Sequence, residues 1–221
     1  MVKHLGNIIF ISLCIIFGGR GALAAKPKLL TATVGHVGQQ IVTSRGVQIN
    51  YLLEKALYGK DRRPGLKLPP LKWGSKNFVQ EVNRVLLEWA VHLEAKTFAS
   101  NYVTSLEVDR AERLAKGLLN GHPQWKKMGI TRKELRLMLE RKIRAKRFLK
   151  FKVRSSVVPI TDGEALDYFE KNRTKFGHLP FEKLKDNVKS FLSRQQVEHR
   201  LKDWFEVLQA KHKVRNLLVG L

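Results

Sequence analysis

The chain has 221 residues, and its 42 lysine and arginine residues outnumber 19 aspartate and glutamate residues, for a formal net charge of +23. Such an excess of basic residues indicates a negatively charged binding partner, namely nucleic acid, an anionic membrane surface or an acidic protein. A single cysteine excludes a disulfide framework within the chain.

The first 24 residues have the pattern of a secretory signal peptide, with a basic start, an apolar core over residues 5–17 and a small-x-small site at 22–24. The apolar core is shorter than the roughly 20 residues that a membrane span needs. We therefore expect export to the periplasm with cleavage near Ala24, and a retained anchor is the alternative. Cleavage removes Cys14, which excludes thiol catalysis in the mature chain, and export argues against a nucleic-acid partner.

Alternating apolar residues predict short strands at both ends of the mature chain. Residues 30–42 alternate loosely around Gly35 and Gly38, and residues 214–219 form the other strand-like run. A solitary hairpin is marginally stable in water. We therefore expect the last strand to pair with the first ones, so that the chain ends meet.

Between these strands, apolar residues return at helical spacing. Helices are predicted at residues 44–57, 76–99, 104–119, 131–154, 165–173 and 180–213, with a short helical or turn segment at 122–129. Capping boxes at 104–107, 131–134 and 161–164 mark three helix starts. The sequence thus predicts a mostly α fold with a small sheet built from the terminal strands.

The segment 58–75 is rich in basic residues, glycine and proline and is predicted to be a loop. It is either a binding arm or a solvated insertion, and we favour the insertion. Trp73, Trp125 and Met128 lie in or beside predicted connections. They are candidates for contact with a bound protein, although a role in packing is the simpler interpretation.

Residues 126–154 contain thirteen lysine and arginine residues against two glutamates. The stretch is either an amphipathic helix with basic side chains along its flanks or an electropositive wall that attracts acidic segments or lipid headgroups. We hold the two interpretations equal. The candidate binding residues of the wall are Arg141, Lys142, Arg144 and Lys146.

No catalytic constellation is evident in the sequence. The histidines show no i, i+4 pairing and no neighbouring ligand set for a metal. There is no nucleophile elbow, and Gly74-Ser75-Lys76 lacks the glycine spacing of a phosphate-binding loop. We expect no enzyme activity, no cofactor and no metal site.

Several short motifs follow one another in an order that is typical of one family. They are Ile41-Val42-Thr43-Ser44, Leu86-Leu87-Glu88-Trp89, Met128-Gly129-Ile130-Thr131, Val158-Pro159-Ile160-Thr161-Asp162 with Tyr168-Phe169 and Asn172, and Pro180-Phe181-Glu182. Through them the chain, from about residue 30 to 218, resembles the SurA-like family of exported chaperones. That family is related to the SurA N-terminal domain and, in fold, to the client-binding module of trigger factor.

The resemblance implies an N-terminal helical chaperone module over residues 25–160, which the long C-terminal helix and the strand within 161–221 complete. In many relatives a parvulin-type prolyl isomerase domain follows the helix that matches residues 165–173. Here only residues 174–180 occupy that place, so the resemblance implies no isomerase activity. Gly46 and the loop 58–75 depart from the family pattern.

We therefore expect a periplasmic holdase-type chaperone that binds unfolded or outer-membrane proteins in an apolar cradle with basic flanks. The alternative is a cationic adaptor of the cell envelope that binds anionic lipid headgroups or wall polymers. A cationic nucleic-acid binder is the third candidate, and it requires that the signal peptide does not function.

Overall fold

The computed structural model describes residues 31–60, 62–63, 68–98 and 102–218, which form seven α-helices, one 3-10 helix and three strands. The expected mostly α fold with a small sheet is confirmed. The expected signal peptide at 1–24 lies outside the described residues.

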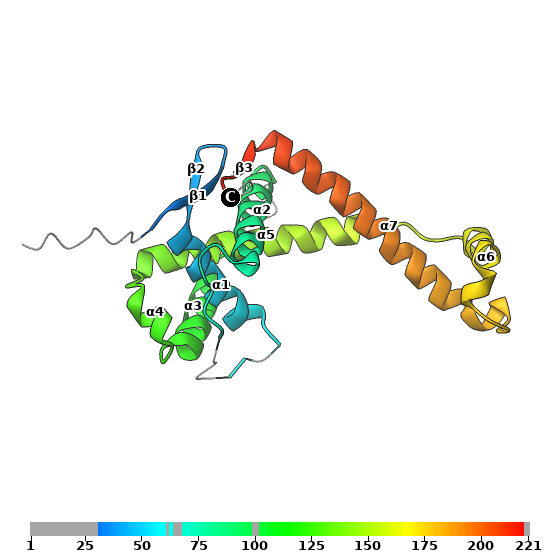
Figure 1. Cartoon of the computed structure of the whole chain (residues 1–221), viewed down its shortest axis with the longest axis horizontal. Helices are drawn as coiled ribbons and strands as arrows, with labels where there is room; N and C mark the ends of the chain where they lie inside the picture. Colours follow the sequence, from blue (N-terminus) through cyan, green and yellow to red (C-terminus); the bar gives the residue numbers. More distant parts are fainter. Residues whose placement is uncertain (1–30, 61, 64–67, 99–101, 219–221) are drawn as a thin grey trace, which may run out of the picture.

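The sheet joins the two ends of the described chain. Its central strand, β1 (Thr33–Val37), pairs antiparallel with β2 (Gln40–Thr43) on one side and with β3 (Val214–Asn216) on the other. Gly38 has φ +56° in the two-residue turn between β1 and β2, a conformation that glycine adopts without strain. The expected pairing of the terminal strands is therefore confirmed (Figure 1).

Five helices and the sheet form the body of the molecule. The helices are α1 (Ser44–Tyr58), α2 (Lys76–Ala95), α3 (Ser105–Leu119), α4 (Pro123–Lys127) and α5 (Arg132–Ser155). The sheet shares one apolar core with α1, α2, α3 and α5, and its fully buried side chains include Val34, Leu52, Phe78, Leu119 and Leu139.

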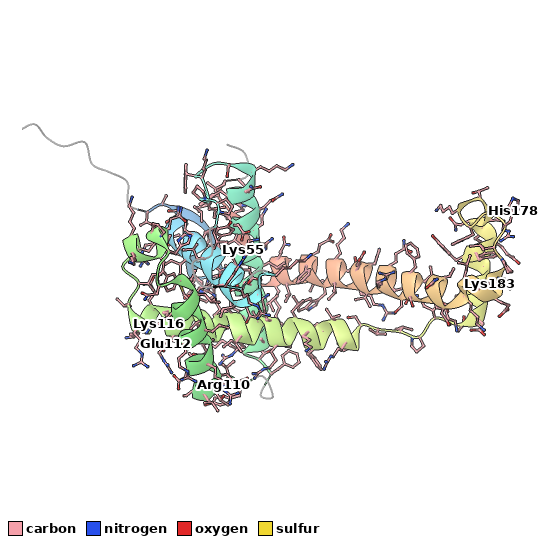
Figure 2. The ribbon with its side chains drawn as sticks, turned by 90° about the horizontal axis from the view of Figure 1, so that it is seen from below. Lys55, Arg110, Glu112, Lys116, His178 and Lys183 are labelled. Carbon is pink, nitrogen blue, oxygen red and sulfur yellow. The ribbon has the colours of Figure 1, made fainter. Side chains whose placement is uncertain are left out.

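An arm and a tip extend from the body (Figures 1 and 2). The tip consists of α6 (Asp162–Lys171), the 3-10 helix η1 (Arg173–Lys175) and the first turns of α7 (Phe181–Lys211). It has its own small apolar core, centred on Ile160, Ala165 and Val188. The arm is the rest of α7 together with the C-terminal half of α5. Since α7 has 31 residues, it is about 46 Å long.

The body end of α7 is held on α2. Glu94 of α2 accepts hydrogen bonds from Lys211 Nζ at 2.7 Å and lies 3.1 Å from His212 Nε2. The next strand, β3, continues this contact, because Asn216 Nδ2 donates to Asn83 Oδ1 at 2.7 Å. The long helix therefore returns from the tip to a fixed place beside the sheet.

The helix starts at Thr104 and Thr161 are complete capping boxes, as the sequence predicts, but the one at Thr131 is half formed. Thr131 Oγ1 accepts from Glu134 N–H, whereas the Glu134 carboxylate binds the guanidinium of Arg45. Arg45 also donates to Met128 O at 2.9 Å. The guanidinium of Arg45 in α1 thus binds the Glu134 carboxylate, which the sequence pattern predicts to complete the cap.

We expect truncation after Lys213, which removes β3, to lower the melting temperature by several degrees. Truncation leaves the edge of β1 that faces β3 without a paired strand, and Val34 O loses the hydrogen bond from Leu217 N–H. Each lost bond costs about 1 kcal/mol, and 1 kcal/mol corresponds to roughly 2–8 °C. Thermal unfolding followed by circular dichroism measures the change. The matched control is Arg215→Ala, which keeps the strand, and an unchanged melting temperature after truncation would contradict a stabilising role of β3.

Candidate functional site

A network of buried charges joins α1, α2 and α5. The side chain of Lys142 is 0% exposed, and its Nζ donates to Glu54 Oε2 at 2.9 Å and to Glu88 Oε2 at 2.6 Å. Arg141 Nε donates to Glu88 Oε1 at 2.9 Å, and Lys146 Nζ donates to Glu54 Oε1 at 2.7 Å. Every charged group of this network therefore has a partner of opposite sign.

The network keeps its carboxylates ionised despite their burial. Burial raises the pKa of Glu88, but the charges and hydrogen bonds of Lys142 and Arg141 outweigh it and hold this pKa below its usual range. The pKa of Glu54 is lowered in the same way, since Lys142 and Lys146 outweigh its desolvation. The network is thus charged at neutral pH.

Of the two interpretations of the basic helix, the electropositive wall is the less well supported at Arg141 and Lys142. Arg141 is 7% exposed and Lys142 is fully buried, so neither presents its charge to a partner. Arg144 lies partly buried and pairs with Glu140 at 2.7 Å. Lys146 is the most exposed of the four candidates, and its charge also pairs with a carboxylate of the network. The physical reason is that carboxylates of α1 and α2 face this side of α5.

The three apolar candidates also differ in their surroundings. Trp73 is 52% exposed, and its ring lies 5.0 Å from that of Phe78. Trp125 and Met128 are partly buried and pack against the core of the body. Of the three side chains, only that of Trp73 is exposed to solvent and so accessible to a binding partner.

An apolar groove, here called the arm groove, lies between α2, α5 and α7. It has a volume of about 540 Å³, and the apolar side chains that line it are Leu87, Val91, Ala145, Leu149, Val153 and Phe205. Polar side chains complete the lining, namely Glu54, Arg84, Glu88, Lys146 and Lys150. In the sequence these residues show only the helical spacing of apolar side chains, which does not distinguish a buried core from an open groove.

Aromatic residues of α7 form one wall of the arm groove. Trp204 and Phe205 lie with ring centroids 5.0 Å apart, and Trp204 lies 6.1 Å from Phe148 of α5. Further along the arm, Arg200 Nη1 donates to Ser156 O at 3.3 Å. These contacts hold α7 beside α5 while the groove stays open to solvent.

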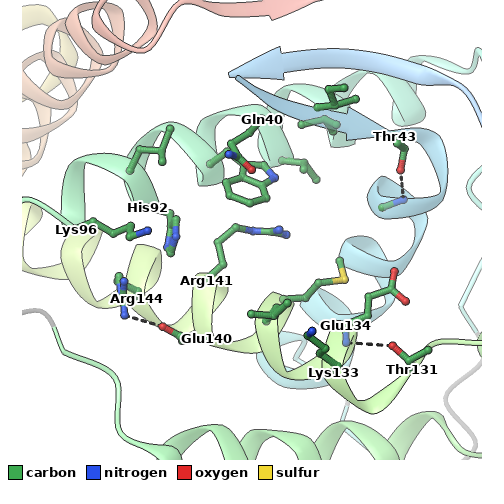
Figure 3. Close-up of a pocket in the computed structure, with 18 residues that line it drawn as sticks. Gln40, Thr43, His92, Lys96, Thr131, Lys133, Glu134, Glu140, Arg141 and Arg144 are labelled. Atoms are coloured by element: carbon green, nitrogen blue, oxygen red, sulfur yellow. Dashed lines mark hydrogen bonds and ion pairs between the residues drawn. The ribbon is translucent and has the colours of Figure 1, made fainter. Parts of the chain in front are cut away.

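A second groove, here called the edge groove, lies between β2, α2 and α5 (Figure 3). It has a volume of about 630 Å³, and its apolar lining includes Val85, Trp89, Leu93, Leu137 and Met138. Basic side chains lie around it, namely Lys96, Lys133, Arg141 and Arg144. The Arg141 guanidinium stacks on the Trp89 ring, with Cζ 4.3 Å from the ring centroid.

His92 is the titratable group buried in the edge groove. Burial, together with the charges of Arg144, Arg141 and Lys96, lowers the pKa of His92 to about 4. The imidazole is therefore neutral at neutral pH. Its Nδ1 is buried and has no hydrogen-bond partner among the described residues.

Within the described residues, no group of three or more histidine, aspartate or glutamate side chains could hold a metal ion. In the same part of the chain, no helix is both long and apolar enough to cross a membrane. The two grooves together are the candidate site, and they lie on either side of the contact between α2 and α5.

We expect Glu88→Gln to destabilise the protein by about 3–5 kcal/mol, because it leaves the buried charge of Lys142 without one of its partners. Urea unfolding measures the change, and Glu140→Gln, which removes a more exposed ion pair, should cost about 1 kcal/mol or less. Equal effects of the two variants would contradict the importance of the network.

The same substitution should change the acid stability. The pKa of Glu88 is lower in the folded than in the unfolded state. Its contribution is therefore complete above the unfolded value of about 4.3 and is lost as the pH falls through the folded value. The free energy of unfolding of the wild type should fall over this range more steeply than that of the variant.

No family model matches the chain, and neither a curated protein nor a solved structure does. The resemblance to the SurA-like family therefore stays a prediction from the sequence motifs.

Proposed function

We propose that the protein is an exported, non-catalytic holdase-type chaperone that binds unfolded segments of other proteins, including outer-membrane proteins, in the arm groove. The observation that carries the proposal is an open groove that three helices line with apolar side chains. Holding an unfolded chain requires exposed apolar surface and no catalytic residue.

The size of the groove suits reversible binding of client side chains. Its volume of about 540 Å³ is within the range of about 300–1,000 Å³ that is typical of ligand pockets. It therefore accepts a few large apolar side chains, each of which contributes roughly 1.5–3 kcal/mol when fully buried. Since association itself costs free energy, the net binding is weak enough for clients to be released.

Further apolar side chains are exposed along the arm and the tip. They are Phe151, Val157, Val158, Leu166, Leu179, Phe191 and Val207. An unfolded chain that occupies the arm groove is long enough to reach several of them. Weak contacts at several places on one chain raise the overall affinity without a tight site at any of them.

The charges of α5 favour the holdase over the adaptor for anionic headgroups or wall polymers. An adaptor requires basic side chains that are free to contact anions. In α5, seven basic side chains already pair with carboxylates of the protein, namely Arg132, Arg136, Arg141, Lys142, Arg144, Lys146 and Arg147. The apolar groove therefore supports the proposal better than the basic helix supports the alternative.

The double variant Leu149→Gln/Val153→Gln tests the arm groove. Both side chains are only partly buried, so the fold should persist, while the groove loses apolar area. Suppression of aggregation of an unfolded outer-membrane protein, followed by light scattering, should weaken about tenfold or more, because 1.4 kcal/mol corresponds to a factor of ten. The matched control is Leu106→Gln, which changes an exposed apolar residue of α3 that lies neither in the groove nor on the arm.

A high salt concentration distinguishes a holdase, which binds by apolar burial, from an adaptor, which binds by charge. Apolar burial persists in 1 M salt, where the screening length falls to about 3 Å, so the wild type should still suppress aggregation. Loss of capture in 1 M salt by protein that remains folded would favour the adaptor, and full activity of the double variant would contradict the arm groove.

Export is tested on the protein made in its native cells. We expect the mature chain to begin at Ala25, because the small-x-small site ends at Ala24. Mass spectrometry of the N-terminal peptide from the periplasmic fraction measures this. A chain that retains Met1 and is found in the cytoplasmic fraction would refute export.

A further inference from the structure

The outer edge of β2 is open in the described structure. The strand order is β2-β1-β3, and no described backbone group pairs with β2 on the side away from β1. In a two-residue hairpin the residues next to the turn, here Val37 and Gln40, exchange both hydrogen bonds. The next residue, Ile41, therefore directs its N–H and C=O away from β1, and it is 65% exposed.

This open edge borders the edge groove. Residues 40–43 of β2 line the groove together with the apolar side chains of Trp89 and Leu93 from α2 and of Leu137 and Met138 from α5 (Figure 3). A strand placed beside β2 would alternate its side chains between the groove and solvent. The groove thus offers both a backbone partner and an apolar surface to an extended chain.

The charged side chains around the edge groove favour a partner that carries negative charge. Lys96 and Lys133 are exposed and form no ion pair with a described residue. The two carboxylates of the lining are already engaged, Glu134 with Arg45 and Glu140 with an arginine of α5. A carboxylate of a partner would therefore meet unpaired positive charge there.

His92 is a second, independent sign of a missing partner. It is 8% exposed, and its Nδ1 has no hydrogen-bond partner among the described residues. A buried polar atom without a partner costs about 1–3 kcal/mol. A polar group of a ligand that reaches this atom would remove that cost.

We propose that the edge groove binds an extended, acidic peptide segment of another protein, which adds a strand to the open edge of β2 and places its carboxylates beside Lys96 and Lys133. Its apolar side chains lie on Trp89 and Met138, as in other cases of strand addition at a sheet edge. A second copy of the chain is a poor occupant, because a protein of net charge +23 repels itself. The inference concerns a site separate from the arm groove and stands without it.

The probe is a fluorescein-labelled, C-terminally amidated heptapeptide, Glu-Thr-Val-Thr-Leu-Thr-Glu, which carries its valine, leucine and both glutamates on one face of a strand and its threonines on the other. Fluorescence anisotropy should show binding at least tenfold tighter than that of the matched peptide with lysine in place of glutamate. Methylation of alternate backbone nitrogens should abolish binding, since it removes the donors that pair with β2. Equal affinities for the acidic and lysine peptides would overturn the proposal.

Variants of the full mature chain locate the site. Lys96→Glu/Lys133→Glu should weaken binding of the acidic peptide at least tenfold and strengthen that of the lysine peptide. Ile41→Pro removes the outward N–H and should abolish binding, whereas Ile41→Ala removes the side chain alone and should retain most of it. The arm-groove variant Leu149→Gln/Val153→Gln should bind the peptide normally, and loss of binding in that variant would overturn the assignment to the edge groove.

Hydrogen exchange gives a readout that does not depend on the stability of a variant. In the wild type, saturating acidic peptide should slow exchange of the Ile41 amide and leave that of α7 unchanged. Unchanged exchange at Ile41 would refute strand addition even if the peptide binds. Sedimentation of the free protein as a dimer, with Ile41 already protected, would identify a second copy as the occupant and would also refute it.

Discussion

The buried ammonium group of Lys142 is the constraint on which the rest of the body depends. A charge removed from water is tolerated only when opposite charges and hydrogen bonds surround it. Glu54 of α1 and Glu88 of α2 supply them, so these two helices must lie where their carboxylates reach one atom of α5. Apolar packing alone tolerates sliding of one helix on another, whereas this arrangement has one register that satisfies every charge.

That register also determines both grooves, which lie on either side of the contact between α2 and α5. On one side, Arg141 pairs with Glu88 of the network and also stacks on Trp89, so it forms part of the edge groove. Glu54, Glu88 and Lys146 line the arm groove on the other side. The same ion pairs that stabilise the body therefore hold apart the helices whose apolar side chains remain open to solvent.

Local signals in the sequence predicted most of the elements. The capping boxes at Thr104 and Thr161 and the apolar spacing place the helices within a few residues of their observed bounds, because both depend on neighbours in the chain. The burial of Lys142 has no such signal, since its partners lie 88 and 54 residues away. For the same reason Arg45, which takes the carboxylate of Glu134 from 89 residues away, left the cap at Thr131 half formed. The apolar cradle with basic flanks stays a prediction, and its basic residues were assigned from the sequence without knowledge of their acidic partners.

Because most charges of α5 are paired, the proposed functions assign the attraction of a client protein and its retention to different residues. Paired side chains contribute little to the field at a distance, so the long-range attraction of acidic clients comes from basic groups outside the network, such as Lys96 and Lys133 at the edge groove. Retention depends on apolar area, and the arm groove, whose apolar residues come from three helices, provides it. Because α2 and α5 line both grooves, a chain drawn to the edge groove is already beside the helices that form the arm groove. In the proposed functions, charge selects a client at the edge groove and apolar burial retains it at the arm groove, and one buried ion-pair network holds both sites in place.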